Sequence, residues 1–104
     1  MPEYRIRAVV FREGDWWVAQ CLEHDFAAVS KSIEELPGEL QWAVTAQIAI
    51  SLERGIQPFH GYSPAPRRFW EMFEGAKTQL EPAAAVSLPT SPEASPRIET
   101  RLAA

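Results

Sequence analysis

The chain has 104 residues, which suits one domain, and its 46% hydrophobic and 11% aromatic residues are enough to build a core. Its net charge of −4 argues against a nucleic-acid-binding face made from bulk positive charge, and the arginine pairs Arg5 with Arg7 and Arg67 with Arg68 are expected to be solvated surface. One cysteine excludes an internal disulfide, and no apolar run reaches the roughly 20 residues that a membrane span requires. Because the start of the chain has no signal-peptide pattern, we expect a cytoplasmic, reduced protein.

Residues 4–11 and 16–22 are predicted to be the two strands of a hairpin, since both are rich in β-branched and aromatic residues. If Glu13 and Gly14 form the turn, Ile6 lies opposite Cys21. A four-residue turn would keep the same two faces. One face is apolar throughout and is expected to line the core: Tyr4, Ile6, Ala8, Val10, Trp17, Ala19 and Cys21. The other face is apolar near the turn and polar at its far end.

Cys21, His24 and Asp25 are the residues most suggestive of catalysis, and a small cytosolic hydrolase using them is one hypothesis. A catalytic cysteine needs a base within hydrogen-bond reach of its sulfur. Cys21, however, is expected to point into the core, where a thiol behaves as a small hydrophobic group. We therefore interpret Cys21 as structural and His24 with Asp25 as a polar loop, and we expect no catalytic residue, metal or cofactor.

A third strand is predicted at about residues 26–31, followed by a long helix at about 33–54. Ser32 and Glu35 have the spacing of a capping box at the start of this helix, and Gly55 is placed to end it. Pro37 interrupts the pattern, so we expect a first turn over 33–36 and a main helix from about residue 37, with Pro37 alternatively at its first position.

The long helix is apolar almost all round, and one apolar stripe along it comprises Leu36, Leu40, Val44, Ile48 and Leu52. A second element or a second copy of the chain must therefore cover the helix. A short helix at about 66–77 carries an aromatic cluster, whose favoured interpretation is packing within the chain against the long helix. Excess apolar surface predicts a homodimer. The surface expected to contact the second copy or another partner comprises Val9, Phe11, Trp16, Val18, Trp42, Phe69, Trp70 and Phe73.

Residues 78–104 contain no aromatic residue and no sustained apolar period, so we predict a disordered tail rich in proline, alanine and serine. Residues 1–77 would then form one α+β domain. Its architecture is expected to be a small antiparallel sheet, made of the hairpin and the third strand, packed on one long helix. The short helix and the disordered tail complete this prediction.

The order strand, turn, strand, loop, strand, long helix is similar to that of the HicB-like antitoxin family. Two stretches carry the resemblance: residues 18–22, V-A-Q-C-L, at the end of a strand, and residues 32–36, S-I-E-E-L, at the helix start. It covers about residues 4–54. The chain departs from the family pattern in having Lys31 before the helix and Pro37–Gly38 within it.

The resemblance implies a truncated RNase H-like fold and a non-enzymatic function, in which the chain dimerises and masks a small ribonuclease toxin of the HicA type. Many HicB-like antitoxins also carry a C-terminal DNA-binding domain, but the one amphipathic segment after residue 54 is too short and aromatic for such a domain. We therefore expect no nucleic-acid binding. A stand-alone domain that binds another protein or a small ligand is the third hypothesis.

Overall fold

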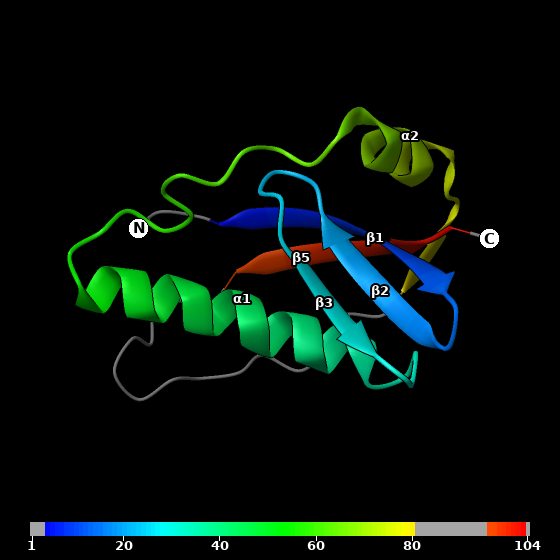
Figure 1. The fold of residues 1–104 in the computed structure, drawn as a ribbon, viewed down its shortest axis with the longest axis horizontal. Helices are drawn as coiled ribbons and strands as arrows, with labels where there is room; N and C mark the ends of the chain where they lie inside the picture. The colour runs from blue at the N-terminus through cyan, green and yellow to red at the C-terminus, as the bar shows by residue number, and fades with distance from the viewer. Residues whose placement is uncertain (1–3, 81–95, 104) are drawn as a thin grey trace.

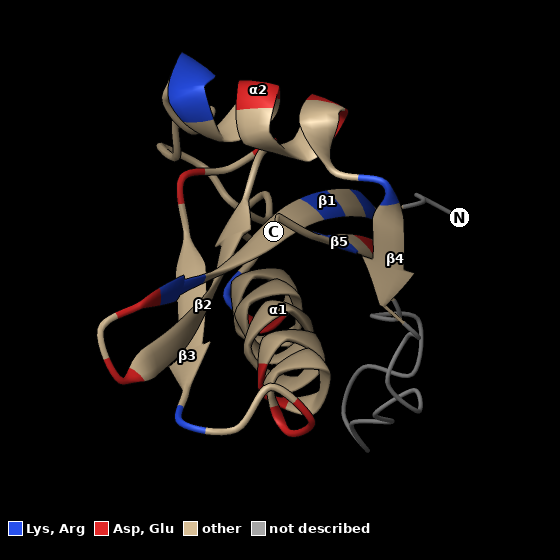
Figure 2. Ribbon diagram, turned by 90° about the vertical axis from the view of Figure 1, so that its right-hand side faces the viewer, with Lys and Arg blue, Asp and Glu red and all other residues tan. Residues whose placement is uncertain are grey.

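The structure is a computed structural model that describes residues 4–80 and 96–103. Its elements follow the chain in the order β1 (Arg5–Glu13), β2 (Trp16–Cys21), β3 (Ala27–Ser30), α1 (Leu36–Glu53), α2 (Arg67–Gly75), β4 (Thr78–Leu80) and β5 (Arg97–Leu102). The strands form one sheet, with α1 on one face and α2 on the other (Figures 1 and 2). The predicted α+β class is confirmed.

The sheet has five strands in the order β3-β2-β1-β5-β4, so it is larger than the predicted three-stranded sheet. It is also mixed rather than antiparallel, because β5 runs parallel to β1, with Arg5 beside Arg97 and Val10 beside Leu102. The prediction that 78–104 forms a disordered tail was wrong for β4 and β5. Residues 81–95 and 104, which belong to the same prediction, lie outside the described residues.

The β1–β2 hairpin turns at Gly14 and Asp15 rather than at Glu13 and Gly14. Glu13 pairs with Trp16, and Cys21 therefore lies opposite Ala8, two residues from the predicted partner Ile6. A shift of two residues preserves the side-chain alternation, so both predicted faces are unchanged. Five residues of the predicted core face are buried against α1, namely Ile6, Ala8, Val10, Ala19 and Cys21, and Tyr4 and Trp17 pack at its edge.

Helix α1 closes this core with Leu36, Leu40, Val44 and Ile48, which are all fully buried. We included Leu52 in the same stripe, but its side chain is 42% exposed. Each step of four residues turns the helix about 40° past a full turn, so after four steps the fifth position has rotated away from the sheet.

The start of α1 differs from the predicted capping box. The Ser32 hydroxyl donates to Glu34 Oε2 at 2.9 Å, and the helix begins at Leu36 with no side-chain cap. Pro37 lies in the first turn, where backbone N–H groups have no acceptor within the helix. The N–H that proline lacks therefore costs the helix no hydrogen bond. The predicted end is confirmed, because Gly55 has a φ of 67° and its N–H donates to the carbonyl of Leu52 at 3.1 Å.

Helix α2 packs on the sheet face opposite α1, and not on α1 as predicted. Phe73 joins Val9 and Leu22 in a second buried cluster on this face. The Trp70 indole N–H donates to the carbonyl of Ala65 at 3.2 Å and fixes the entry into the helix. Each sheet face therefore has its own helix, and the exposed face of α1 is not covered by α2 (Figure 2).

Candidate functional site

The sheet face that carries α2, called the outer face below, is only partly covered. The buried cluster of Val9, Leu22 and Phe73 occupies its centre, and Phe69 stacks on Phe11 with ring centroids 5.8 Å apart. Beyond this stack, toward the hairpin turn and β3, neither of the two helices in residues 4–80 and 96–103 covers this face of the sheet. The outer face thus has a closed part under α2 and an open part beside it.

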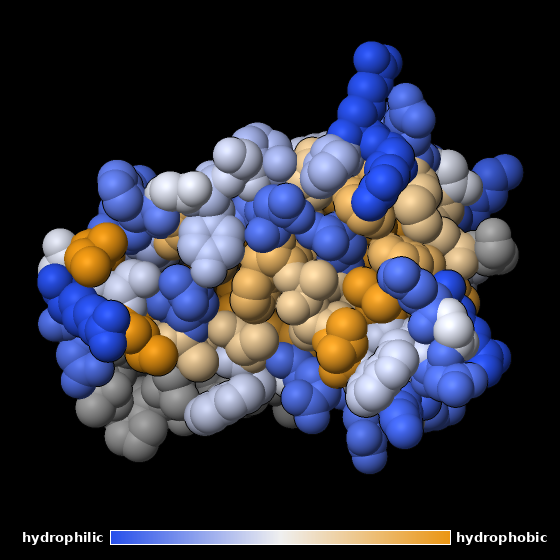
Figure 3. Space-filling model, in the orientation of Figure 1, coloured by the Kyte–Doolittle hydropathy of each residue, from blue (hydrophilic) through white to orange (hydrophobic). Residues whose placement is uncertain are grey.

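The open part is apolar. Trp16 is 45% exposed and Val29 is 53% exposed, and Phe11 and Val18 lie partly buried on the same face. Val18 and Val29 are directly paired across β2 and β3. Figure 3 shows apolar atoms gathered over the β2 and β3 region between the two helices. We call Phe11, Trp16, Val18 and Val29 the hairpin patch.

The structure divides the predicted partner surface into three parts. Phe11, Trp16 and Val18 lie together in the hairpin patch, whereas Trp42 is 51% exposed on α1. The remaining four residues pack inside the chain around α2: Val9, Phe69, Trp70 and Phe73. Val29 was missed. Aligning β3 with β2 would have placed Val29 directly opposite Val18, on the same face of the sheet, and so could have identified Val29 from the sequence.

Carboxylates border the hairpin patch. Glu13 and Asp15 are exposed at the hairpin turn, and Glu34, Glu35 and Glu39 are exposed at the start of α1. Figure 2 shows both acidic segments at the same end of the molecule. Within the patch, the Lys31 ammonium lies 5.2 Å from the centroid of the Trp16 ring. The patch therefore has an apolar centre, two carboxylates at its hairpin-turn end and one ammonium group over its tryptophan, and the acidic start of α1 lies on the other face of the sheet.

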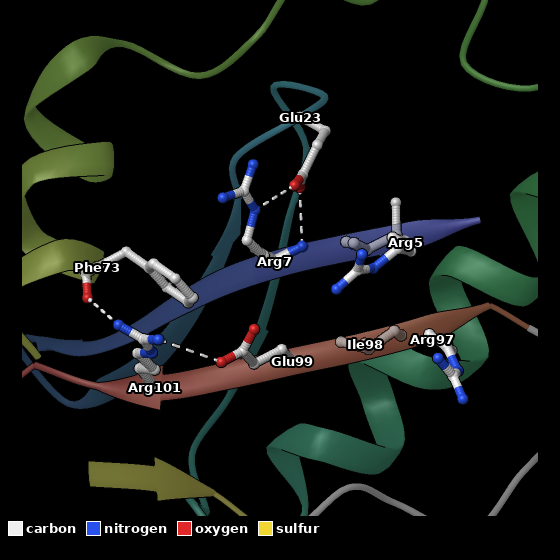
Figure 4. A pocket seen from close by; sticks show the side chains of 9 residues that line it. Arg5, Arg7, Glu23, Phe73, Arg97, Ile98, Glu99 and Arg101 are labelled. Carbon is white, nitrogen blue, oxygen red and sulfur yellow. Dashed lines mark hydrogen bonds and ion pairs between the residues drawn. The ribbon is translucent and has the colours of Figure 1, made fainter. Parts of the chain in front are cut away.

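A second concave site lies on the outer face over β1 and β5, next to α2. It is a cleft of about 620 Å³ whose lining includes Arg5, Arg7, Arg97 and Arg101, with Glu23 and Glu99 among them (Figure 4). The parallel register brings the four arginines together, since Arg5 pairs with Arg97 and Val9 with Arg101. Sequence reasoning treated Arg5 and Arg7 as solvated surface and missed the other two because it placed them in a tail.

Arg7 and Arg101 make contacts within the chain that reach α2. The Arg7 Nε donates to Glu23 Oε2 at 2.6 Å, and its guanidinium lies 4.8 Å from the centroid of the Trp70 ring. Arg101 donates to the Phe73 carbonyl at 3.3 Å and lies 4.3 Å from the centroid of the Phe73 ring. Both contacts join the sheet to α2, so these cations stabilise the position of the helix.

The side chains of Cys21, His24 and Asp25 contact different parts of the chain. Cys21 is 1% exposed, and burial, assisted by the nearby Glu23 charge, raises the pKa of its thiol to about 12. His24 stacks on Phe59 with centroids 4.1 Å apart, and burial lowers the pKa of its imidazole against the opposing effect of Glu23. The Asp25 carboxylate accepts a hydrogen bond from Gln20 Nε2 at 2.9 Å. The buried Cys21 thiol is therefore protonated at neutral pH.

Within residues 4–80 and 96–103, no group of three or more His, Cys, Asp or Glu side chains is arranged to hold a metal ion. Neither α1 nor α2, the helices of that same part of the chain, has the length and apolar character to cross a bilayer. Comparisons of the chain with protein-family models, with curated proteins and with solved structures gave no match.

Proposed function

We propose that the chain is a non-enzymatic protein-binding domain, an antitoxin similar to the HicB-like family that masks a small ribonuclease toxin in the cytoplasm. The observation that carries this proposal is the hairpin patch, in which Trp16 and Val29 are about half exposed on a face that α2 closes only in its centre. Exposed aromatic and aliphatic side chains that lie together are typical of protein-binding surfaces.

The charge around the patch favours a basic partner. A ribonuclease must attract RNA phosphates, and the surface it uses for this is therefore positive. The chain carries a net charge of −4, and carboxylates such as Glu13 and Asp15 border the patch. Complementary charge would guide such a partner to the patch and discriminate against acidic proteins.

The arrangement of residues 5–53 supports the family part of the proposal. Three consecutive strands followed by one long helix have the order and approximate lengths on which the resemblance was based. The hydrolase hypothesis has less support. Cys21 is buried under α1, and its raised pKa removes the thiolate that a nucleophile requires.

The proposal is tested first in the genome and then by binding. We expect a short reading frame for a small ribonuclease next to the gene, and we expect its product to co-purify with this chain after co-expression. Ribonuclease activity of that product should be lost in the complex. A catalytically inactive form of the toxin allows binding to be measured without toxicity.

Trp16→Ala and Trp42→Ala form a matched pair, since both remove a tryptophan that is about half exposed, one from the patch and one from α1. Loss of a central interface tryptophan typically weakens binding by about 2 kcal/mol or more, or roughly thirtyfold. We expect this loss for Trp16→Ala and little change for Trp42→Ala, by titration calorimetry. Equal effects of the two substitutions, or no binding at all, would contradict the proposal.

A further inference from the structure

Strand β3 ends the sheet on one side, because no other strand in residues 4–80 and 96–103 pairs with it beyond β2 (Figure 1). An unpaired edge exposes backbone N–H and C=O groups that can bind another strand. Natural edges are commonly blocked by proline, by charged residues or by a bulge. Residues Ala27–Ser30, with the sequence AAVS, contain neither proline nor a charged residue.

Alternate residues of β3 hydrogen-bond to β2, and this alternation identifies the backbone groups that are exposed at the edge. The N–H of Cys21 donates to the carbonyl of Phe26 at 2.9 Å, and Ala19 pairs with Ala28. Hydrogen-bonded pairs recur at every second residue of an antiparallel ladder, so the even-numbered residues of β3 bond to β2. The N–H and C=O groups of Ala27 and Val29 therefore point away from β2, in the plane of the sheet, toward its open edge.

We propose that two copies of the chain pair antiparallel along β3, about a two-fold axis at Ala28. In this register Ala27 of each copy lies opposite Val29 of the other, so the outward N–H and C=O groups of both residues all find partners. At the centre, Ala28 lies opposite its own copy in a non-hydrogen-bonded pair. Such pairs bring Cα atoms to about 4.5 Å, a separation that suits a side chain as small as alanine.

Charge favours the same register. Asp25 and Lys31 flank β3, and both side chains lie on the outer face: Asp25 accepts from Gln20 at 2.9 Å, and Lys31 lies 5.2 Å from the centroid of the Trp16 ring. Pairing about Ala28 brings opposite ends of the two strands together, so the Asp25 carboxylate of each copy lies near the Lys31 ammonium of the other. Registers centred on Ala27 or on Val29 lose this match. The strand is thus self-complementary, which favours a second copy over an unrelated strand.

The neighbouring segment of the chain sets a limit to this pairing. The N–H of Asp25 donates to the carbonyl of Ser63 at 2.6 Å, so the segment between α1 and α2 occupies the edge at that residue. The first free backbone groups of the edge are therefore those of Ala27, and Asp25 would take part through its carboxylate alone. The paired strands would join the two sheets and bring the two hairpin patches onto one continuous outer face.

The inference does not depend on toxin binding, and its test uses the full chain alone. We expect a dimer at micromolar concentration by sedimentation velocity. Val29→Pro removes the outward N–H and should give a monomer, whereas Val29→Thr keeps that N–H and the β-branched shape and should remain a dimer. Circular dichroism of both variants checks that they fold. A monomeric natural chain, or a folded Val29→Pro dimer, would overturn the proposal.

Charge reversal tests the register without altering the backbone. Lys31→Glu places two carboxylates near each other and should weaken the dimer about tenfold, as should Asp25→Lys through neighbouring ammonium groups. The double variant, or a mixture of the two single variants, restores opposite charges and should recover association. Failure of the mixture to associate better than either variant alone would contradict the register.

Disulfide trapping reads the register directly. In a Cys21→Ala background, Ala28→Cys should form an intermolecular disulfide under mild oxidation, because the predicted Cα separation of about 4.5 Å lies within the range that disulfides accept. Ala27→Cys and Val29→Cys are the matched controls and should not cross-link, since neither residue meets its own copy. Cross-linking at either control position in place of Ala28 would refute the two-fold axis at Ala28.

Discussion

The two faces of the sheet are built from alternate residues of the same strands, yet they differ in how completely they are covered. Against α1, the side chains of Ala8, Val10 and Cys21 are at most 1% exposed. On the outer face, Val9 is equally buried under α2, but Trp16 and Val29 are about half exposed. One face is a closed core, and the other is closed only in its centre.

Helix length explains the difference. Helix α1 has 18 residues and α2 has nine, which corresponds to about 27 Å and about 13 Å at 1.5 Å per residue. The short helix cannot reach both the centre of the sheet and the hairpin turn. The apolar residues near the turn therefore remain open, so the α1 face is expected to supply stability and the outer face to supply the binding surface.

The largest contrast between the faces should come from Leu40→Ala and Trp16→Ala. Leu40 is fully buried between α1 and the sheet, so its truncation leaves a cavity and should cost about 2–5 kcal/mol in the free energy of unfolding. Trp16→Ala removes a larger side chain that is 45% exposed and should cost at most about 1 kcal/mol. Urea unfolding monitored by circular dichroism measures both. Equal costs would show that the outer face is as much a part of the core as the α1 face.

Cys21→Ser should destabilise the chain by about 1–2 kcal/mol, because it puts a hydroxyl group among apolar side chains on the α1 face. The raised thiol pKa adds a pH dependence. The folded state binds the Cys21 thiol proton more tightly than the unfolded state does. The stability that this proton contributes should therefore be lost as pH rises from about 9 toward about 12 in the natural chain. The variant should lack this component. Rapid alkylation of the native thiol at neutral pH would contradict the buried position.

The α1 face could be predicted from the sequence because side-chain alternation does not depend on the turn. The hairpin turn was placed one residue too early, and the partner of Cys21 was wrong by two residues, but an even shift leaves Cys21 on the same face. The stripe from Leu36 to Ile48 was likewise fixed by helical periodicity. Only Leu52 was misplaced, because a strict spacing of four drifts around the helix.

The outer face and the end of the sheet were harder to predict. Residues Arg97–Leu102 alternate charged and uncharged side chains, with Ile98 and Leu102 packed against the α1 core. This pattern is typical of a strand, but averaging the composition over the whole of 78–104 concealed it. The arginine cleft depends on β5 lying beside β1, a pairing between residues far apart in the chain, and local patterns in the sequence do not specify it.

Arg101→Gln tests whether the arginines of the cleft hold α2 on the outer face. The substitution removes the charged donor to the Phe73 carbonyl and the contact with the Phe73 ring, and should cost about 1 kcal/mol. Amide hydrogen exchange should accelerate in α2 more than in α1. Arg67→Gln is the control, because Arg67 is 91% exposed in an ion pair with Glu71 and should matter by less than about 0.5 kcal/mol. Uniform acceleration in both helices would argue against a local role for Arg101.

The smallest effect should be a pH dependence at His24, which stacks on Phe59 at the border of the α1 core. Burial lowers the pKa of His24 in the folded state, so the unfolded chain binds the proton more tightly. The stability present above a pH of about 6.5 should therefore decline as pH falls below that value. His24→Gln should flatten the decline in melting temperature between about pH 7.5 and about pH 5.5, relative to the natural chain. His60→Gln is the matched control, because it makes the same exchange at an exposed histidine. If both variants keep the natural slope, the acid sensitivity arises from carboxylates, and the stacked imidazole does not couple protonation to folding.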